Sequence, residues 1–142
     1  MNVLNGYDIE DLKVGMQASF TKTVTDADIT MFVGVSGDNN AIHIDDEFAA
    51  TTPFKGRIAH GILTASIISA AIANRLPGPG VIYMGQNLRF KAPVRPGETV
   101  RATVTVTEID LVKKRVTLST VCTVKEKVVI DGDALVKPTS RT

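Results

Sequence analysis

A long apolar stretch in the middle of the chain constrains the fold most strongly. From Ile62 to Leu76, apolar side chains recur at helical intervals, and the remaining narrow face is filled mainly by alanine and serine. The Pro-Gly-Pro-Gly run at residues 77–80 cannot continue a helix. The stretch is too short to span a bilayer and is interrupted by polar residues. It therefore predicts a long helix in the middle of the protein, and no membrane segment.

Alternating side chains dominate the second half of the chain. Small apolar residues alternate there with polar ones, which is the period-two pattern of a strand with one buried face. Together with an early strand, they predict an α+β fold in which about five antiparallel strands wrap around the long central helix. Because the edges of such a sheet need cover, we also expect a homodimer. The predicted strands include residues 17–24, 100–107, 116–120 and 128–136, and the predicted turns are residues 96–97, 110–114 and 125–127.

Two shorter helices are predicted before the central one. Thr25 and Asp28 have the spacing of a capping motif, and apolar residues follow at helical intervals until about Gly34. Residues 47–50 predict another short helix, which Pro53 bounds. Turn-forming residues start the intervening segment, residues 36–43, so we expect a loop that presents its side chains.

Size and composition limit the class of protein. A chain of 142 residues fits one domain, residues 1–142. Its 16 basic and 15 acidic residues are scattered, so we expect no nucleic-acid partner. Residues 1–6 lack the positive flank and apolar core of a secretory signal, so we expect a cytoplasmic protein. The single cysteine, Cys122, is predicted to be a small buried hydrophobe and not a nucleophile.

Residues suited to acid–base chemistry gather in one short window. Asp38 and His43 lie five residues apart in the predicted loop, so both could reach one water molecule. A carboxylate beside an imidazole makes an acid–base pair that operates near neutral pH. From spacing alone, the commoner outcome is an aspartate that caps a backbone amide and a histidine without a catalytic role. Both interpretations stay open at this point.

The dipeptide His60-Gly61 opens the central helix. A glycine there leaves backbone amides uncovered at the positive end of the helix dipole, where an oxygen that gains negative charge is stabilised. Close packing at a helix start explains Gly61 equally well. We expect the His60 side chain to be structural. A metal site made of His43, Asp45 and His60 is not expected, because zinc catalysis needs three protein ligands plus water and no HxxxH or CxxC spacing occurs.

A longer motif resembles a known family. Residues 36–43, Ser-Gly-Asp-Asn-Asn-Ala-Ile-His, followed by five residues and Ala49, resemble the hydratase 2 motif of the MaoC-like, (R)-specific enoyl-CoA hydratases. The chain is most similar to the short single-domain hydratases that feed polyhydroxyalkanoate synthesis. The resemblance implies a hot dog fold, a dimer, and reversible syn hydration of trans-2-enoyl-CoA to (R)-3-hydroxyacyl-CoA without a metal or redox cofactor. The similarity continues through residues 48–54, 58–61, 76–80 and 85–94.

The resemblance also implies roles for individual residues. Asp38 and His43 fall on the catalytic pair of the family, and Gly61 falls on its oxyanion-hole amide. Ser69 falls on a serine of the central helix that supports the site. One departure is Ala41, where the family usually has a proline, so a fixed backbone torsion between the catalytic residues is lost. Both catalytic positions are nevertheless retained.

Other functions share parts of this pattern. A hot dog acyl thioesterase would bind similar substrates, but Asp38 with His43 in this motif favours hydration. An acyl-CoA-binding sensor would not need the pair, and we expect it to carry an effector domain. A 3-hydroxyacyl-ACP dehydratase uses the same site chemistry. The sequence contains no Gly-rich phosphate-binding loop. It therefore does not distinguish CoA from acyl carrier protein as the carrier of the acyl group.

Overall fold

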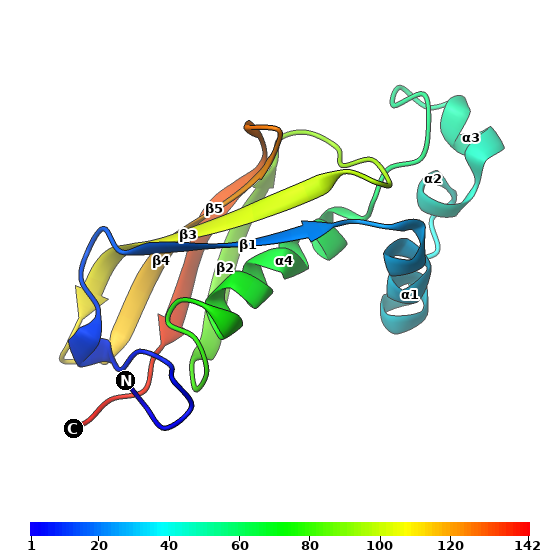
Figure 1. The fold of residues 1–142 in the computed structure, drawn as a ribbon. Helices are drawn as coiled ribbons and strands as arrows, with labels where there is room; N and C mark the ends of the chain where they lie inside the picture. The colour runs from blue at the N-terminus through cyan, green and yellow to red at the C-terminus, as the bar shows by residue number, and fades with distance from the viewer.

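A curved antiparallel sheet with a long helix against one face forms the body of the protein (Figure 1). This computed structural model describes all residues, 1–142. The strand order is β1-β3-β4-β5-β2, so β1 and β2 are the two edges. The sheet wraps around the helix as predicted, which is the hot dog fold. The strands are β1 (Gln17–Thr23), β2 (Ile82–Phe90), β3 (Thr99–Asp110), β4 (Arg115–Val124) and β5 (Lys127–Lys137), and the long helix is α4 (Gly61–Asn74).

A group of short helices lies beyond the N-terminal end of α4 (Figure 1). The chain forms them on its way from β1 to α4, whereas the 3₁₀-helix η1 (Ile9–Asp11) precedes β1. No helix of the structure combines the length and the apolar character needed to cross a membrane. The three short helices are α1 (Asp26–Ser36), α2 (Ala41–Ile44) and α3 (Asp46–Ala50).

The hydrophobic core lies between the sheet and one face of α4. Alternate residues of β3 and β4 are buried, as the period-two pattern predicted. They share one buried cluster with the inward face of the helix. Each fully buried isoleucine or leucine contributes about 1.5–3 kcal/mol relative to an exposed one. The helix contributes Ile67, Ile68, Ala71 and Ile72, and the two strands contribute Val100, Ala102, Val104, Val106, Val116, Leu118, Cys122 and Val124.

The capping motif at the start of α1 forms as predicted. The Asp28 backbone amide donates to Thr25 Oγ1 over 3.1 Å, and the Thr25 amide donates to an Asp28 carboxylate oxygen over 2.9 Å. The helix does not end near Gly34, however, but continues to Ser36. Gly37 ends it with φ of 80°, the left-handed conformation that glycine adopts without strain. The predicted end of the helix was therefore wrong, because the helix continues through Gly34 and Gly37 ends it.

Two other elements differ from the sequence predictions. The strand β2 had not been located, because it is an edge strand without regular burial and with a bulge between Tyr83 and Gly85. The helix α4 is less enclosed than predicted, since the sheet covers only one side of it. Ile62 is 58% exposed, and Ser66 and Ser69 are also exposed.

The burial of Cys122 leads to a first prediction. The thiol is 0% exposed inside β4, and burial raises its pKa to about 12. At pH 8 only about one thiol in ten thousand is then ionised, and the thiolate is the reactive form. We expect native protein to resist iodoacetamide at pH 8 and to react fully in denaturant, as measured by mass spectrometry. Rapid alkylation of the folded protein would contradict the burial of this side chain.

Candidate active site

His43 lies on α2, a single helical turn where a loop was expected. Asn40 starts the turn, because its side-chain oxygen accepts a hydrogen bond from the Ile42 amide over 3.2 Å. The His43 side chain is almost fully buried, and its Nδ1 lies 2.7 Å from the backbone oxygen of Ile58. A carbonyl can only accept, so Nδ1 carries the hydrogen. The Nε2 atom is therefore the site at which the ring gains or loses a proton.

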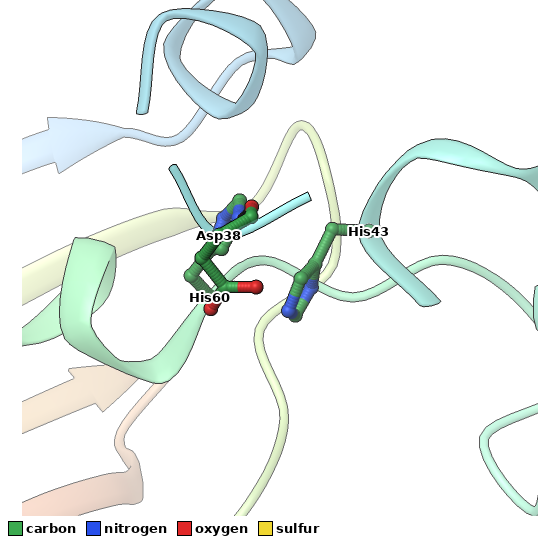
Figure 2. Close-up of side chains that lie close together, drawn as sticks. All are labelled: Asp38, His43 and His60. Atoms are coloured by element: carbon green, nitrogen blue, oxygen red, sulfur yellow. Dashed lines mark hydrogen bonds between the residues drawn. The ribbon is translucent and has the colours of Figure 1, made fainter. Parts of the chain in front are cut away.

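Asp38 lies in the short loop that joins α1 to α2, and its carboxylate is turned toward the His43 ring (Figure 2). One carboxylate oxygen accepts a hydrogen bond from the Asn40 amide over 3.3 Å, so the capping role considered from the sequence is present. The other oxygen has no partner in the chain. One carboxylate oxygen of Asp38 and one ring nitrogen each of His43 and His60 all lie within 4.8 Å of one another.

These distances suit a shared water molecule. A water that makes hydrogen bonds of about 2.8 Å to two groups holds those groups roughly 4.5 Å apart. The structure therefore brings Asp38 and His43 together as predicted, within reach of one water. Their catalytic roles remain predictions that follow from this geometry and from the motif.

His60 joins the same cluster. The sequence predicted a structural side chain here, but not its contacts with Asp38 and His43. Its side chain is 1% exposed, and its Nε2 lies 2.9 Å from the backbone oxygen of Asp38. Its ring stacks on that of His43 with centroids 3.9 Å apart. The only signal in the sequence was that His60 is the other histidine of the chain, next to the predicted oxyanion amide.

Gly61 begins α4 beside an apolar cavity of about 520 Å³. The first backbone hydrogen bond inside the helix comes from Thr64, so the amides before it point outward from the helix end. A Cβ on Gly61 would lie 2.6 Å from the Phe90 ring, which confirms the close-packing explanation for this glycine. The oxyanion role stays a prediction. Other residues that line the cavity are Phe54, Ile58, Ala59, Ile62, Thr64, Lys91, Ala92, Pro93, Val94 and Ile130.

Ser69 is the one predicted site residue that lies apart from the others within this chain. It is eight positions beyond Gly61 on α4, or about 12 Å along the helix axis. Its side chain is on the exposed side of the helix and forms no hydrogen bond within the chain. The supporting role of Ser69 therefore stays a prediction.

Two arginines hold the segment that leads into α4, and neither of their contacts was predicted from the sequence. Arg57 pairs with Asp26 of α1 at 2.8 Å and with Asp46 of α3 at 2.6 Å. The hydrogen bonds that the Arg57 guanidinium donates to the Asp26 and Asp46 carboxylates raise its pKa above the usual value. Arg95 donates to the backbone oxygens of Phe54 and Gly56. Both guanidinium groups thus hold residues 54–57 in place behind His43.

The metal site considered from the sequence would have needed Asp45. That carboxylate instead caps α3, where it accepts a hydrogen bond from the Phe48 amide over 3.1 Å. Asp38 takes its place near the two histidines. One ring nitrogen of each histidine is already bonded to a backbone oxygen, and the second nitrogen of His60 is buried. The set considered from the sequence, with Asp45 as a ligand, is therefore not brought together by the fold.

Comparison with known proteins identifies the family. Residues 11–128 match the MaoC like domain, so the chain belongs to that family.

Several relatives and solved structures of similar length are hydratases or dehydratases by name. An (R)-specific enoyl-CoA hydratase of Rhodospirillum rubrum is 54% identical over 93% of this chain and 92% of its own. A 3-hydroxybutyryl-CoA dehydratase of Methylorubrum extorquens is 47% identical over 90% of this chain and 82% of its own. The unliganded structure of an R-hydratase from Pseudomonas aeruginosa superposes with a TM-score of 0.90 and 42% identity, covering 96% of this chain and 88% of that one. The structure of the (R)-hydratase from A. caviae involved in PHA biosynthesis gives a TM-score of 0.88 and 40% identity, covering 91% and 98%.

The position of Ala41 leads to a second prediction. Ala41 is the first residue of α2, where an amide hydrogen has no helical partner and proline is favoured. Asn40, with φ of −54° and ψ of 130°, already has a backbone that can precede proline. We expect Ala41→Pro to raise the free energy of unfolding by about 0.4–1 kcal/mol, because it restricts the unfolded chain. Denaturant unfolding measures the change.

The matched control is an alanine of the next short helix. The Ala49 amide donates to the Asp45 oxygen over 2.9 Å, so Ala49→Pro removes a bond and should destabilise the protein. Equal losses of stability in both variants would contradict the assignment of Ala41 to a first helical position.

Proposed function

We propose that this protein is an (R)-specific enoyl-CoA hydratase, which adds water reversibly and with syn geometry to trans-2-enoyl-CoA and gives (R)-3-hydroxyacyl-CoA. The observation that carries the proposal is the pair formed by the Asp38 carboxylate and the His43 ring. One carboxylate oxygen of Asp38 and one ring nitrogen of His43 lie within 4.8 Å of each other, which is close enough to share one water, beside the outward amides at the start of α4. The hydratases among the relatives support the same activity.

Binding of the thioester follows from the cavity beside Gly61. The cavity is mostly apolar and opens at the N-terminal end of α4, which suits the pantetheine and the acyl carbons next to the thioester. We place the thioester oxygen against the Gly61 amide. When the enolate forms, negative charge moves onto that oxygen, and one well-placed donor stabilises it by about 3 kcal/mol. The helix dipole adds to this stabilisation.

Proton transfer is assigned to Asp38 and His43 as a unit. One of them takes a proton from the bound water as its oxygen bonds to C3, and the other gives a proton to C2 from the same face. The proton held by the first then passes to the second, which restores the resting pair. On His43 the moving proton is the one on Nε2, because Nδ1 stays bonded to the Ile58 oxygen throughout.

No cofactor is required for this chemistry. Water adds across a double bond without any net oxidation or reduction, and coenzyme A is part of the substrate. We therefore propose that the enzyme works without metal or redox cofactor.

The alternative functions fit the observations less well. Acyl carrier protein dehydratases are also among the relatives, but one from Arabidopsis thaliana is 35% identical over 66% of this chain, against 54% for the CoA hydratase. A thioesterase would attack the thioester carbon, whereas the proposed pair directs water to C3. A sensor domain would not need two groups held around one water. CoA thioesters are therefore the proposed substrates.

We propose that the protein acts in the cytoplasm. We also propose that its product, (R)-3-hydroxyacyl-CoA, is used for polyhydroxyalkanoate synthesis. The A. caviae hydratase is named for that process.

We also propose that the protein is a homodimer that pairs at the β2 edge. This edge strand exposes Ile82 by 57%, Met84 by 46% and Phe90 by 53%, which is unusual for a surface that stays in water. Ile62, on the uncovered side of α4, is 58% exposed. A second copy would bury these side chains and satisfy the free backbone groups of the strand.

Sedimentation velocity tests the dimer. Wild-type protein should sediment at twice the chain mass of 15.2 kDa. Ile82→Glu places a charge in the proposed interface and should shift the equilibrium toward monomer. The control Val112→Glu lies in the turn between β3 and β4, where the side chain is 93% exposed, and should remain dimeric. A wild type that is monomeric at all concentrations, or two variants that behave alike, would contradict the proposal.

Hydration of crotonyl-CoA, followed as loss of enoyl absorbance, tests the activity. Wild-type protein should turn over rapidly, and EDTA should not change the rate. Asp38→Asn and His43→Gln should each lower kcat by about 100-fold or more, because each removes one of the two proton-transfer groups. A wild type that is inactive on short and longer enoyl-CoAs, or mutants that keep full activity, would overturn the assignment. Enoyl-ACP and thioesterase assays would then be the next step.

A further inference from the structure

His60 contacts both members of the proposed catalytic pair. It is the N-cap residue of α4, yet its side chain makes no capping hydrogen bond. The buried ring is directed instead at the two segments that carry Asp38 and His43 (Figure 2). Three separate connections run from this one residue.

The first connection is a hydrogen bond to the backbone of Asp38. His60 Nε2 lies 2.9 Å from the Asp38 carbonyl oxygen, which can only accept, so Nε2 carries the hydrogen. In the neutral ring Nδ1 is then bare, and this atom is buried without a partner in the chain. The bond holds the main chain of Asp38 and leaves its carboxylate free to face His43.

The second connection is a stack of aromatic rings. The planes of His60 and His43 are inclined by only 28°, with centroids 3.9 Å apart. On the α1 side, Phe32 meets the His60 ring edge to face at 4.8 Å. His43 is thus held by the Ile58 oxygen at one ring nitrogen and by the His60 ring against its face. Little freedom remains for the His43 side chain.

The third connection is covalent, because Gly61 is the next residue. The proposed oxyanion amide therefore moves with the His60 backbone. One side chain links the loop of Asp38, the ring of His43 and the start of α4, and these three come from separate segments of the chain.

We infer that His60 is a positioning residue, which keeps the Asp38–His43 pair at a fixed distance from the Gly61 amide. It transfers no proton itself. Acid–base catalysis and charge stabilisation then act on the same bound thioester, and a displacement of about 1 Å between such groups lowers a rate by about 100-fold. This inference rests on the proposed hydratase function.

Two substitutions separate the contacts of His60. His60→Phe keeps a flat ring against His43 but removes the donor to the Asp38 oxygen. His60→Gln removes the ring but keeps an amide donor near the position of Nε2. The control is Ile68→Val, which is equally buried in α4 but lies in the core.

The kinetic readout is kcat and KM for crotonyl-CoA in protein shown to be folded. His60→Phe should lower kcat by about 100-fold with KM changed by less than about threefold, since the substrate cavity is untouched. The kcat of His60→Gln should be at least about tenfold higher than that of His60→Phe, because the glutamine amide can still donate to the Asp38 oxygen. Ile68→Val should lower Tm and keep kcat within about twofold, because it alters packing alone. Equal inactivity of the Phe and Gln variants would show that the donor to the Asp38 oxygen does not position the pair, and full activity of both would indicate no role; either result overturns the inference.

Hydrogen–deuterium exchange supplies a readout that does not depend on activity. Loss of the bond to Asp38 should speed exchange of the amides in residues 37–44 by about tenfold in His60→Phe, and not in Ile68→Val. Unchanged exchange in this segment would overturn the positioning role even if the wild type proved inactive. An inactive wild type with faster exchange in the variant would instead count against the hydratase proposal alone. If His60→Phe does not fold, the same comparison is made with His60→Leu, which also removes the donor to the Asp38 oxygen.

Discussion

The packing of α4 in the curve of the sheet fixes the place where chemistry can occur. One face of the helix is buried against β3 and β4, so its N-terminal end has a defined position and direction. The uncovered amides of that end, and the cavity beside Gly61, follow from this packing. The chain between β1 and α4 then supplies the proposed acid–base pair from outside the sheet. A rigid body thus carries the proposed charge-stabilising amide, and the loop after α1 and the short helix α2 carry Asp38 and His43.

Backbone oxygens fix one ring nitrogen of each of the two histidines. His43 donates to the Ile58 oxygen and His60 to the Asp38 oxygen, and each bond selects one ring nitrogen. The carboxylate of Asp38 and the remaining nitrogen of His43 stay available for a ligand. Arg57 and Arg95 hold the segment that provides the Ile58 oxygen, through carboxylates and further backbone oxygens. Because these contacts are mutually dependent, the site is a network in which the loss of one bond affects several groups.

The sequence predicted the parts of this site that depend on local pattern. Alternation gave β3 and β4, and the motif placed Asp38, His43 and Gly61 in one functional group. It did not predict α2, because Asn40 looked like a loop residue and acts as a helix cap. It did not locate β2, because an edge strand lacks alternation, and it missed His60, because its partners are distant in the chain or are backbone atoms. Ser69 lies on the exposed side of α4, a position that one chain alone does not explain.

The stereochemistry of hydration in D₂O tests the central claim most directly. One carboxylate oxygen of Asp38 and one ring nitrogen of His43 lie within 4.8 Å of each other. In the proposed mechanism they act around one water, so the hydroxyl and the proton should reach the substrate from one face. Crotonyl-CoA hydrated in D₂O should give a product with the (R) configuration at C3 and with deuterium at C2 on the face that received the hydroxyl. NMR of the product determines both centres. Addition from opposite faces would contradict the account, because a single pair around one water delivers both groups to one face of the double bond. An (S) product would contradict the proposed (R) specificity, because the substrate would then present its other face to the pair.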